Sequence, residues 1–152
     1  MNNSILVAIA ILTQGDSVLM QLRDDIPGII YPGCWGFFGG HLEPSETPEE
    51  ALEREILEEI AYQIPRTKIQ KFGVYSDELQ SETLKSVHRH VFQVPLTVFL
   101  RDLILNEGWD MRLLNQQAAQ DGGAYSEKAK KWRPMPAIHQ QILLDFYKQY
   151  KE

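Results

Sequence analysis

This chain of 152 residues lacks several features that mark common protein classes. It has one cysteine, Cys34, which excludes an internal disulfide and any zinc site built from several cysteines. The apolar run at residues 5–12 is too short for the ~20 residues that span a membrane. No Lys or Arg precedes this run, as one would in a secretory signal. We therefore expect a cytoplasmic protein with no membrane contact.

An excess of basic charge is also missing. Lys and Arg total 15 against 21 Asp and Glu, and the resulting net charge of −6 argues against a nucleic-acid polymer as partner. The acid excess is local, because residues 43–59 hold eight Glu and one Arg while the rest holds 13 acids and 14 bases. The chain is otherwise ordinary, with 43% hydrophobic and 24% charged residues, and its length predicts one domain over residues 1–152.

Apolar periodicity and turn residues predict interspersed strands and helices. A hairpin is expected from residues 5–13 and 18–23, and further strands at 35–42, 68–75, 87–99 and 110–114, the last followed by a helical turn. Helices are predicted at 47–61 and 137–150, the first because Thr47, Pro48 and Glu50 form an N-terminal capping pattern. Loops are expected at 24–33, 77–86, 120–124 and 133–136. This order predicts an α/β (mixed α+β) fold, with a mixed β-sheet sandwiched between helices.

Carboxylates gather on one side of the helix predicted at 47–61. Glu55, Glu58 and Glu59 stand at i, i+3 and i+4, apart from the apolar stripe of that helix. Stacked like charges cost about 0.2–0.5 kcal/mol per pair, and a hard cation such as Mg²⁺ or Mn²⁺ relieves them. A solvated acidic face is the alternative. Gly39-Gly40 just before the helix favours a ligand site, because backbone without β-carbons lets a ligand approach closely.

One run of residues carries a family resemblance. From Gly40 the chain has five residues, Glu46, seven residues, and then Arg54-Glu55-Ile56-Leu57-Glu58-Glu59-Ile60-Ala61-Tyr62. This closely resembles the Nudix box, G-x5-E-x7-R-E-U-x-E-E-x-G-U, in which U is a bulky aliphatic residue. Every charged position matches, whereas Ala61 and Tyr62 replace the last glycine and aliphatic residue. The box spans 23 of the 152 residues, and the predicted element order is similar to that of the Nudix fold.

The resemblance to the Nudix hydrolase family implies a reaction. It implies metal-dependent hydrolysis of a pyrophosphate bond in a nucleoside diphosphate linked to another moiety, with Mg²⁺ or Mn²⁺ as cofactor and water attacking phosphorus. It also implies a set of metal ligands, namely the carboxylates of Glu55, Glu58 and Glu59 and the main-chain carbonyl of Gly39 or Gly40.

Residues around these ligands are given roles by the same resemblance. Arg54 would orient the carboxylates, and Glu46 would support the loop before the helix. Glu107, in a predicted turn, is the candidate for a fourth ligand or general base, with an ordinary exposed turn residue as the alternative. Arg23 leaves the second strand toward the glycines, where it would meet a substrate phosphate or point into solvent.

The substrate is narrowed by residues outside the box. Ser76 stands where members that cleave ADP-ribose often have a proline, and the motif of the NADH type and the tyrosine position of the diadenosine-polyphosphate type are also missing. Within the resemblance this leaves a nucleoside triphosphate, including an oxidised one, or a nucleotide sugar. The partner is then a small nucleotide, and a homodimer is left open. The alternative of another class is a non-catalytic nucleotide sensor on the Nudix fold. His88 and His90 alternate on a predicted strand and share a face, which we interpret as an ordinary strand face.

Overall fold

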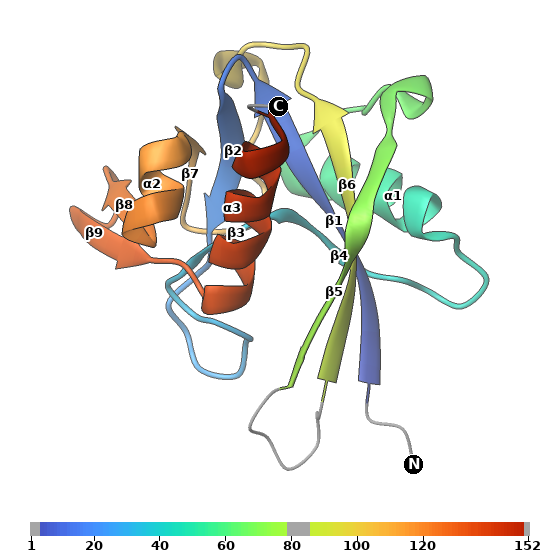
Figure 1. Ribbon diagram of the computed structural model, residues 1–152, viewed down its shortest axis with the longest axis horizontal. Coiled ribbons are helices and arrows are strands. Elements are labelled where there is room, and N and C mark those ends of the chain that lie inside the picture. The colour runs from blue at the N-terminus through green and yellow to red at the C-terminus, as the bar shows by residue number, and fades with distance from the viewer. Residues whose placement is uncertain (1–3, 79–85, 151–152) are drawn as a thin grey trace.

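The computed structural model describes residues 4–78 and 86–150, which form one main sheet with helices on both faces (Figure 1). The strands are β1 (Ser4–Gln14), β2 (Ser17–Leu22), β3 (Trp35–Gly36), β4 (Phe38–His41), β5 (Gln70–Glu78), β6 (Ser86–Pro95), β7 (Asp110–Leu114), β8 (Gly123–Ser126) and β9 (Lys131–Pro134). The helices are α1 (Pro48–Ile60), α2 (Gln116–Asp121) and α3 (Ala137–Tyr150), with single 3₁₀ turns at Arg66–Lys68 and Leu100–Asp102.

Strand β1 is the centre of the sheet. The strand order is β3-β2-β1-β6-β5, with β4 paired to β1 and β7 paired to β2. Only the β1–β6 pair is parallel among the described strands, so the sheet is mixed as predicted. The C-terminal end of β1 pairs with β2 in the predicted hairpin. The middle of β1 pairs with β4, which brings Gly39 and Gly40 against the middle of the sheet.

Alternate residues of β1 face two separate cores. Ile9 and Ile11 pack in the core that contains Leu143 of α3, whereas Ala8 and Ala10 pack in the core beneath α1. This is the period of two that a strand imposes on its side chains. The small alanines face α1, so the carboxylate helix can lie close to β1 and β4. The predicted arrangement of a mixed sheet between helices is confirmed.

The ends of α1 follow from its sequence. Thr47 Oγ1 accepts the N–H of Glu50 at 3.1 Å, and the Glu50 carboxylate accepts the N–H of Thr47 at 2.9 Å, so the predicted capping box is present. Ala61 ends the helix in the left-handed region, with φ +57°, and its N–H bonds to the carbonyl of Leu57. The exit therefore keeps the geometry that glycine adopts most easily, although an alanine there costs about 1 kcal/mol more.

Several predicted elements need correction. Residues 35–42 form two strands and not one, because the chain changes partner from β2 to β1 at Phe37. The loops predicted at 120–124 and 133–136 are wrong in part, since β8 and β9 form a two-stranded sheet in which Tyr125 opposes Trp132. The Gly and Pro residues that indicated loops lie at the ends of this hairpin. The strands predicted at 68–75 and 87–99 are displaced to β5 and β6, and part of the connection between them lies outside the described residues.

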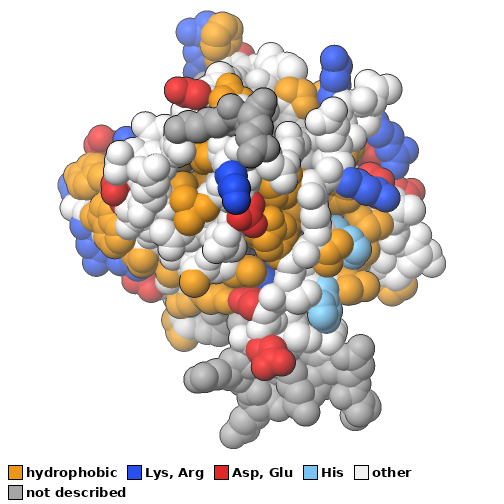
Figure 2. Space-filling view, viewed as in Figure 1, with side chains coloured by type: hydrophobic (Ala, Val, Ile, Leu, Met, Phe, Trp, Pro, Cys, Tyr) orange, Lys and Arg blue, Asp and Glu red, His pale blue; other side chains and the backbone are white. Residues whose placement is uncertain are grey.

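Two surface findings bear on partners. No helix among the described residues is long and apolar enough to cross a membrane. On the face seen in Figure 2, Lys and Arg side chains lie scattered among acidic and apolar ones. That face therefore has no continuous basic patch of the kind that attracts nucleic-acid polymers.

Candidate active site

The carboxylates of α1 lie against the glycine pair of β4. Glu59 is only 5% exposed, and its Oε1 accepts the backbone N–H of Gly39 at 2.9 Å. A β-carbon on Gly40 would fall 2.5–2.8 Å from the carboxyl atoms of Glu55. One on Gly39 would fall 2.0 Å from the carbonyl oxygen of Ala8, and Gly39 has φ +141°, which other residues rarely adopt. Gly39 must be glycine so that β4 can pair closely with β1, and Gly40 must be glycine to leave room for the Glu55 carboxylate.

Arg54 gathers the neighbouring carboxylates. Its Nε and Nη2 donate to the two oxygens of Glu46 at 2.8 and 2.9 Å, a bidentate pair that lowers the pKa of Glu46 to about 2. Its Nη1 donates to Glu55 at 2.9 Å and lies 3.6 Å from Glu58. Nη2 also donates to the carbonyl of His41 at 3.0 Å. Arg54 therefore ties the loop before α1 to the helix and directs two of the three carboxylates.

The segment that carries Glu107 is fixed to the end of α1. Asn106 donates its backbone N–H to the carbonyl of Glu59 at 2.8 Å, and its side chain donates to the carbonyl of Glu58 at 3.1 Å. On its other side, the carbonyl of Glu107 accepts the amide of Gln21 at 2.7 Å. Burial is the main cause that raises the pKa values of Glu55 and Glu59, and the negative charge of Glu107 adds to both. Glu107 therefore stands beside the carboxylates of α1.

The cluster holds more negative charge than its surroundings solvate. Burial raises the pKa of Glu59 to about 9, with Glu107 and Glu55 adding to the rise while the Gly39 N–H and the Arg23 charge oppose it. Burial also raises the pKa of Glu55, against the bond from Arg54. A divalent cation would reverse both shifts, and oxygen donors are what Mg²⁺ and Mn²⁺ prefer. The donor set therefore suits such an ion.

The predicted ligands do not converge on one point. Among residues 4–78 and 86–150, no three His, Cys, Asp or Glu side chains are arranged to hold a metal ion. The reason is visible in the contacts, because Glu55 and Glu58 turn toward Arg54 while Glu59 turns toward Gly39. The α1 carboxylates are neighbours, and their oxygens are held by an arginine and a backbone amide.

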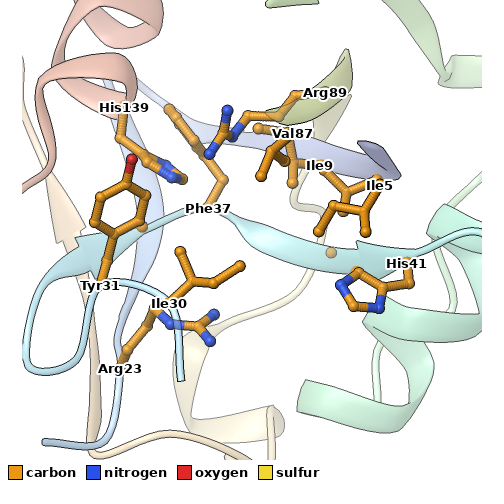
Figure 3. Close-up of a pocket in the computed structure, with 14 residues that line it drawn as sticks. Ile5, Ile9, Arg23, Ile30, Tyr31, Phe37, His41, Val87, Arg89 and His139 are labelled. Carbon is orange, nitrogen blue, oxygen red and sulfur yellow. The ribbon is translucent and has the colours of Figure 1, made fainter. Parts of the chain in front are cut away.

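A cavity of about 120 Å³ opens beside the glycine pair (Figure 3). Arg89 of β6 and Arg23 lie on opposite sides of it, and Tyr31 and His139 close one end, with His41 at the other. Its apolar wall consists of Ile5, Val7, Ile9, Ile30, Phe37 and Val87. Gly39 and Gly40 also line it, so the cavity and the carboxylate cluster share one piece of backbone.

Three of these polar residues were not among the sequence predictions. Tyr31 lies in the glycine- and proline-rich loop, Arg89 lies on β6, and His139 belongs to α3. Arg89 is flanked by His88 and His90, which stay on the other face of β6 as predicted and do not line the cavity. The only signal for Arg89 in the sequence was its position between the two histidines. Because side chains alternate along a strand, Arg89 faces the opposite side from them, toward the interior. Arg23 was predicted near the site, and it lines the cavity.

Together the fold and the site define a class. A mixed sheet between helices presents a glycine pair, a capped helix of carboxylates and an adjoining cavity of nucleobase scale, an arrangement suited to hydrolysing a nucleotide anhydride. The model of the NUDIX domain family matches residues 4–137, and the chain belongs to that family. It is therefore a Nudix-type pyrophosphohydrolase, and the predicted enzyme class is confirmed.

Relatives and solved structures agree with this assignment. Nucleoside triphosphatase NudI of Escherichia coli O81 (strain ED1a) is 31% identical over 112 residues, covering 70% of this chain and 77% of the relative. The same-named protein of strain K12 / DH10B is 36% identical over 83 residues, 55% of this chain and 57% of the relative. A MutT protein from Methanosarcina mazei Go1 superposes with a TM-score of 0.76 at 20% identity, over 99% of this chain and 98% of that one. The Escherichia coli ORF135 protein gives 0.71 at 21%, over 98% and 92%. These two structures support the fold.

Proposed function

We propose that this protein hydrolyses the pyrophosphate bond of a nucleoside triphosphate with the help of Mg²⁺ or Mn²⁺. The observation that carries the proposal is Glu59, a carboxylate buried against the Gly39 N–H with Glu55 and Glu107 close enough to raise its pKa. Such a group has no evident purpose in a stable core, because burying a carboxylate without a cation is costly. Perturbed carboxylates beside a cavity are typical of catalytic sites.

The proposed ligands are the carboxylates of Glu55, Glu58 and Glu59 and the carbonyl of Gly39 or Gly40. When bound there, a divalent cation neutralises phosphate oxygens and lowers the pKa of the attacking water. The side chain of Glu58 is 60% exposed, so its movement away from Arg54 meets little resistance. Arg54 keeps its bidentate bond to Glu46 in either arrangement, which holds the helix and the glycine loop together.

Glu107 and Arg23 complete the proposed chemistry. Glu107 stands on a segment that is fixed to α1, so it either takes the proton of the attacking water or completes the ligand set. Arg23 lines the cavity and its charge acts on Glu59, which supports the proposal that it meets a substrate phosphate.

The choice of a triphosphate over a nucleotide sugar rests on two supports. Both relatives given above bear the name nucleoside triphosphatase. The cavity of about 120 Å³ has room for a base but not for a whole nucleotide sugar. The sugar that such a substrate carries beyond its phosphates would therefore lie in solvent. An oxidised triphosphate remains within the proposed class. Cytoplasmic location and homodimerisation stay predictions.

The test is hydrolysis of a panel of nucleoside triphosphates and nucleotide sugars with Mg²⁺ or Mn²⁺. We expect Glu58→Gln and Glu59→Gln to lower turnover at least ~10²-fold, the scale for losing a stabiliser of transition-state charge. Glu49→Gln is the matched control, because it makes the same change on α1 at a side chain with no ion pair among the described residues. Parent-level turnover in both site variants would refute the proposed metal site.

Glu107→Gln separates the two roles of that residue. Loss of a general base lowers kcat at every concentration of Mg²⁺, whereas loss of a ligand raises the Mg²⁺ concentration needed for half-maximal rate. Unchanged kcat and unchanged Mg²⁺ dependence would remove Glu107 from the mechanism.

A further inference from the structure

The cavity beside the glycine pair contains a buried polar cluster that the hydrolytic chemistry does not use. Arg89 is 3% exposed, and its Nη1 donates to Oδ1 of Asp77 at 2.5 Å. The hydroxyl of Tyr31 donates to the other oxygen of Asp77, also at 2.5 Å. Tyr31 holds this position with φ +54°, a backbone conformation that is strained for a non-glycine residue. Strain of this kind persists where the surroundings fix a side chain in place.

The guanidinium of Arg89 has donors to spare. A guanidinium carries five N–H groups in a rigid fork, and Asp77 takes one of them. Tyr31 also bonds to the Arg89 side chain, which leaves further N–H groups of the fork free, and that side chain lines the cavity and points into it (Figure 3). Its charge is balanced by Asp77, so what it offers a ligand is hydrogen-bond donation more than net charge.

His139 supplies the complementary group. Its ring is 9% exposed and stacks on Phe37 with centroids 5.3 Å apart, and its Nδ1 is buried without a partner among the described residues. Burial lowers the pKa of His139 to about 3, with the charge of Arg89 adding to the effect, so the ring is neutral and has one N–H and one lone pair. The positive guanidinium favours a lone pair on the ring nitrogen that faces it.

These groups match one edge of a nucleobase. Uracil, thymine and guanine present a C=O acceptor next to a ring N–H donor, whereas cytosine and adenine present an amino donor next to a ring-nitrogen acceptor. An arginine N–H beside an imidazole lone pair pairs with the first edge and opposes the second. The apolar wall, which includes Phe37 stacked on His139, suits the faces of a planar ring, and the cavity volume equals roughly four waters' share of liquid.

We propose that Arg89 and His139 select nucleotides whose base carries a carbonyl next to a ring N–H, with Asp77 and Tyr31 holding Arg89 in position. The inference rests on the proposed function, because it assumes that the cavity takes the base of the nucleotide whose phosphates reach α1. It assigns the substrates as uracil, thymine and guanine nucleotides in preference to cytosine and adenine nucleotides.

The experiment compares substrates that differ only at this edge. We expect kcat/KM to be at least about tenfold higher for UTP than for CTP, and for GTP than for ATP where a purine fits, which is the discrimination that one good paired edge provides. His139→Phe keeps the ring and breaks no bond within the described protein, so it should fold and bring the UTP/CTP ratio toward 1. Arg89→Lys keeps a positive charge beside Asp77 but loses the forked set of N–H donors, and it should also bring the UTP/CTP ratio toward 1. Arg101→Gln, at an exposed arginine over Phe99, is the matched control and keeps the parent ratio.

Binding keeps this test separate from the test of hydrolysis. Calorimetric titration with UMP and CMP in the absence of metal should show the same preference in the parent and its loss in His139→Phe. If no triphosphate is hydrolysed, the proposed function fails while UMP against CMP still decides the base preference. Equal kcat/KM for UTP and CTP in the parent, or a ratio that both variants leave unchanged, would overturn the inference. So would equal binding of UMP and CMP.

Discussion

Glu59→Gln should make the metal-free protein more stable while removing its activity. Glu59 is 5% exposed and its pKa in the folded chain is about 9, against an ordinary value of 4.5. At neutral pH the folded protein therefore holds a proton on Glu59 that the unfolded chain has released. Glutamine has the shape of the protonated acid and can still accept the Gly39 N–H through its carbonyl oxygen.

The size of the effect follows from linkage. A raised carboxyl pKa means that stability is full below pH 4.5 and is lost as the pH rises toward about 9. Each pH unit in that window costs about 1.36 kcal/mol, so at pH 7 the parent has lost about 3 kcal/mol that the variant keeps. For a chain of this length, that difference corresponds to a rise in Tm of roughly 6–12 °C.

The assay is urea unfolding at pH 4, 5.5 and 7 with a chelator present. The two proteins should unfold at the same urea concentration at pH 4 and diverge as the pH rises. Glu49→Gln serves as the control and should stay within about 0.5 kcal/mol of the parent throughout. A variant that is no more stable than the parent at pH 7, or a difference that does not change with pH, would refute the reasoning about Glu59.

Three further outcomes follow from the same geometry. Adding Mg²⁺ should raise the Tm of the parent, and above Kd the rise should grow with the logarithm of the Mg²⁺ concentration. Differential scanning fluorimetry would detect this rise, and the Tm of Glu59→Gln should rise far less. Gly39→Ala should cost more than about 3 kcal/mol in urea unfolding, because φ is +141° and the new β-carbon meets the carbonyl of Ala8; a near-neutral result would show that β4 can move away from β1. Arg54→Lys should lower kcat at least about tenfold with little change in KM, because an ammonium cannot hold Glu46 through two bonds and still direct Glu55. An unchanged kcat in steady-state kinetics would contradict this role of Arg54.

The main elements of the fold were predictable because they depend on local signals. Thr47 and Glu50 specify where α1 begins, and the alternation of β1 specifies its two faces. The β8–β9 hairpin was missed because its strands have four residues each and begin or end at Gly123 and Pro134. Such short strands are stabilised by cross-strand contacts, here Tyr125 with Trp132, that a single segment does not reveal.

The candidate site divides in the same way. Glu55, Glu58 and Glu59 are fixed relative to one another by one helix, so their spacing in the sequence is sufficient to find them. Glu107 was predicted through the family resemblance, and the bonds of Asn106 to α1 show how its segment is held at the end of that helix. Arg89 and His139 were missed, because they come from β6 and α3 and meet only after the sheet and its helices assemble.

The distribution of charge around the cavity favours one orientation of the anionic substrate proposed above. Arg89 is paired with Asp77, so the base end of the cavity has little net charge with which to attract phosphates. Arg23 has no carboxylate partner within ion-pair distance among the described residues, and it lies on the side of the cavity from which its charge reaches Glu59. With a divalent cation on α1, the phosphates of the proposed substrate would therefore lie toward Arg23 and α1, and the base would be left to the neutral end. Arg23→Gln should raise KM for a triphosphate more than it changes the UTP/CTP ratio, and steady-state kinetics in which the ratio changes more than KM would assign Arg23 to the base instead.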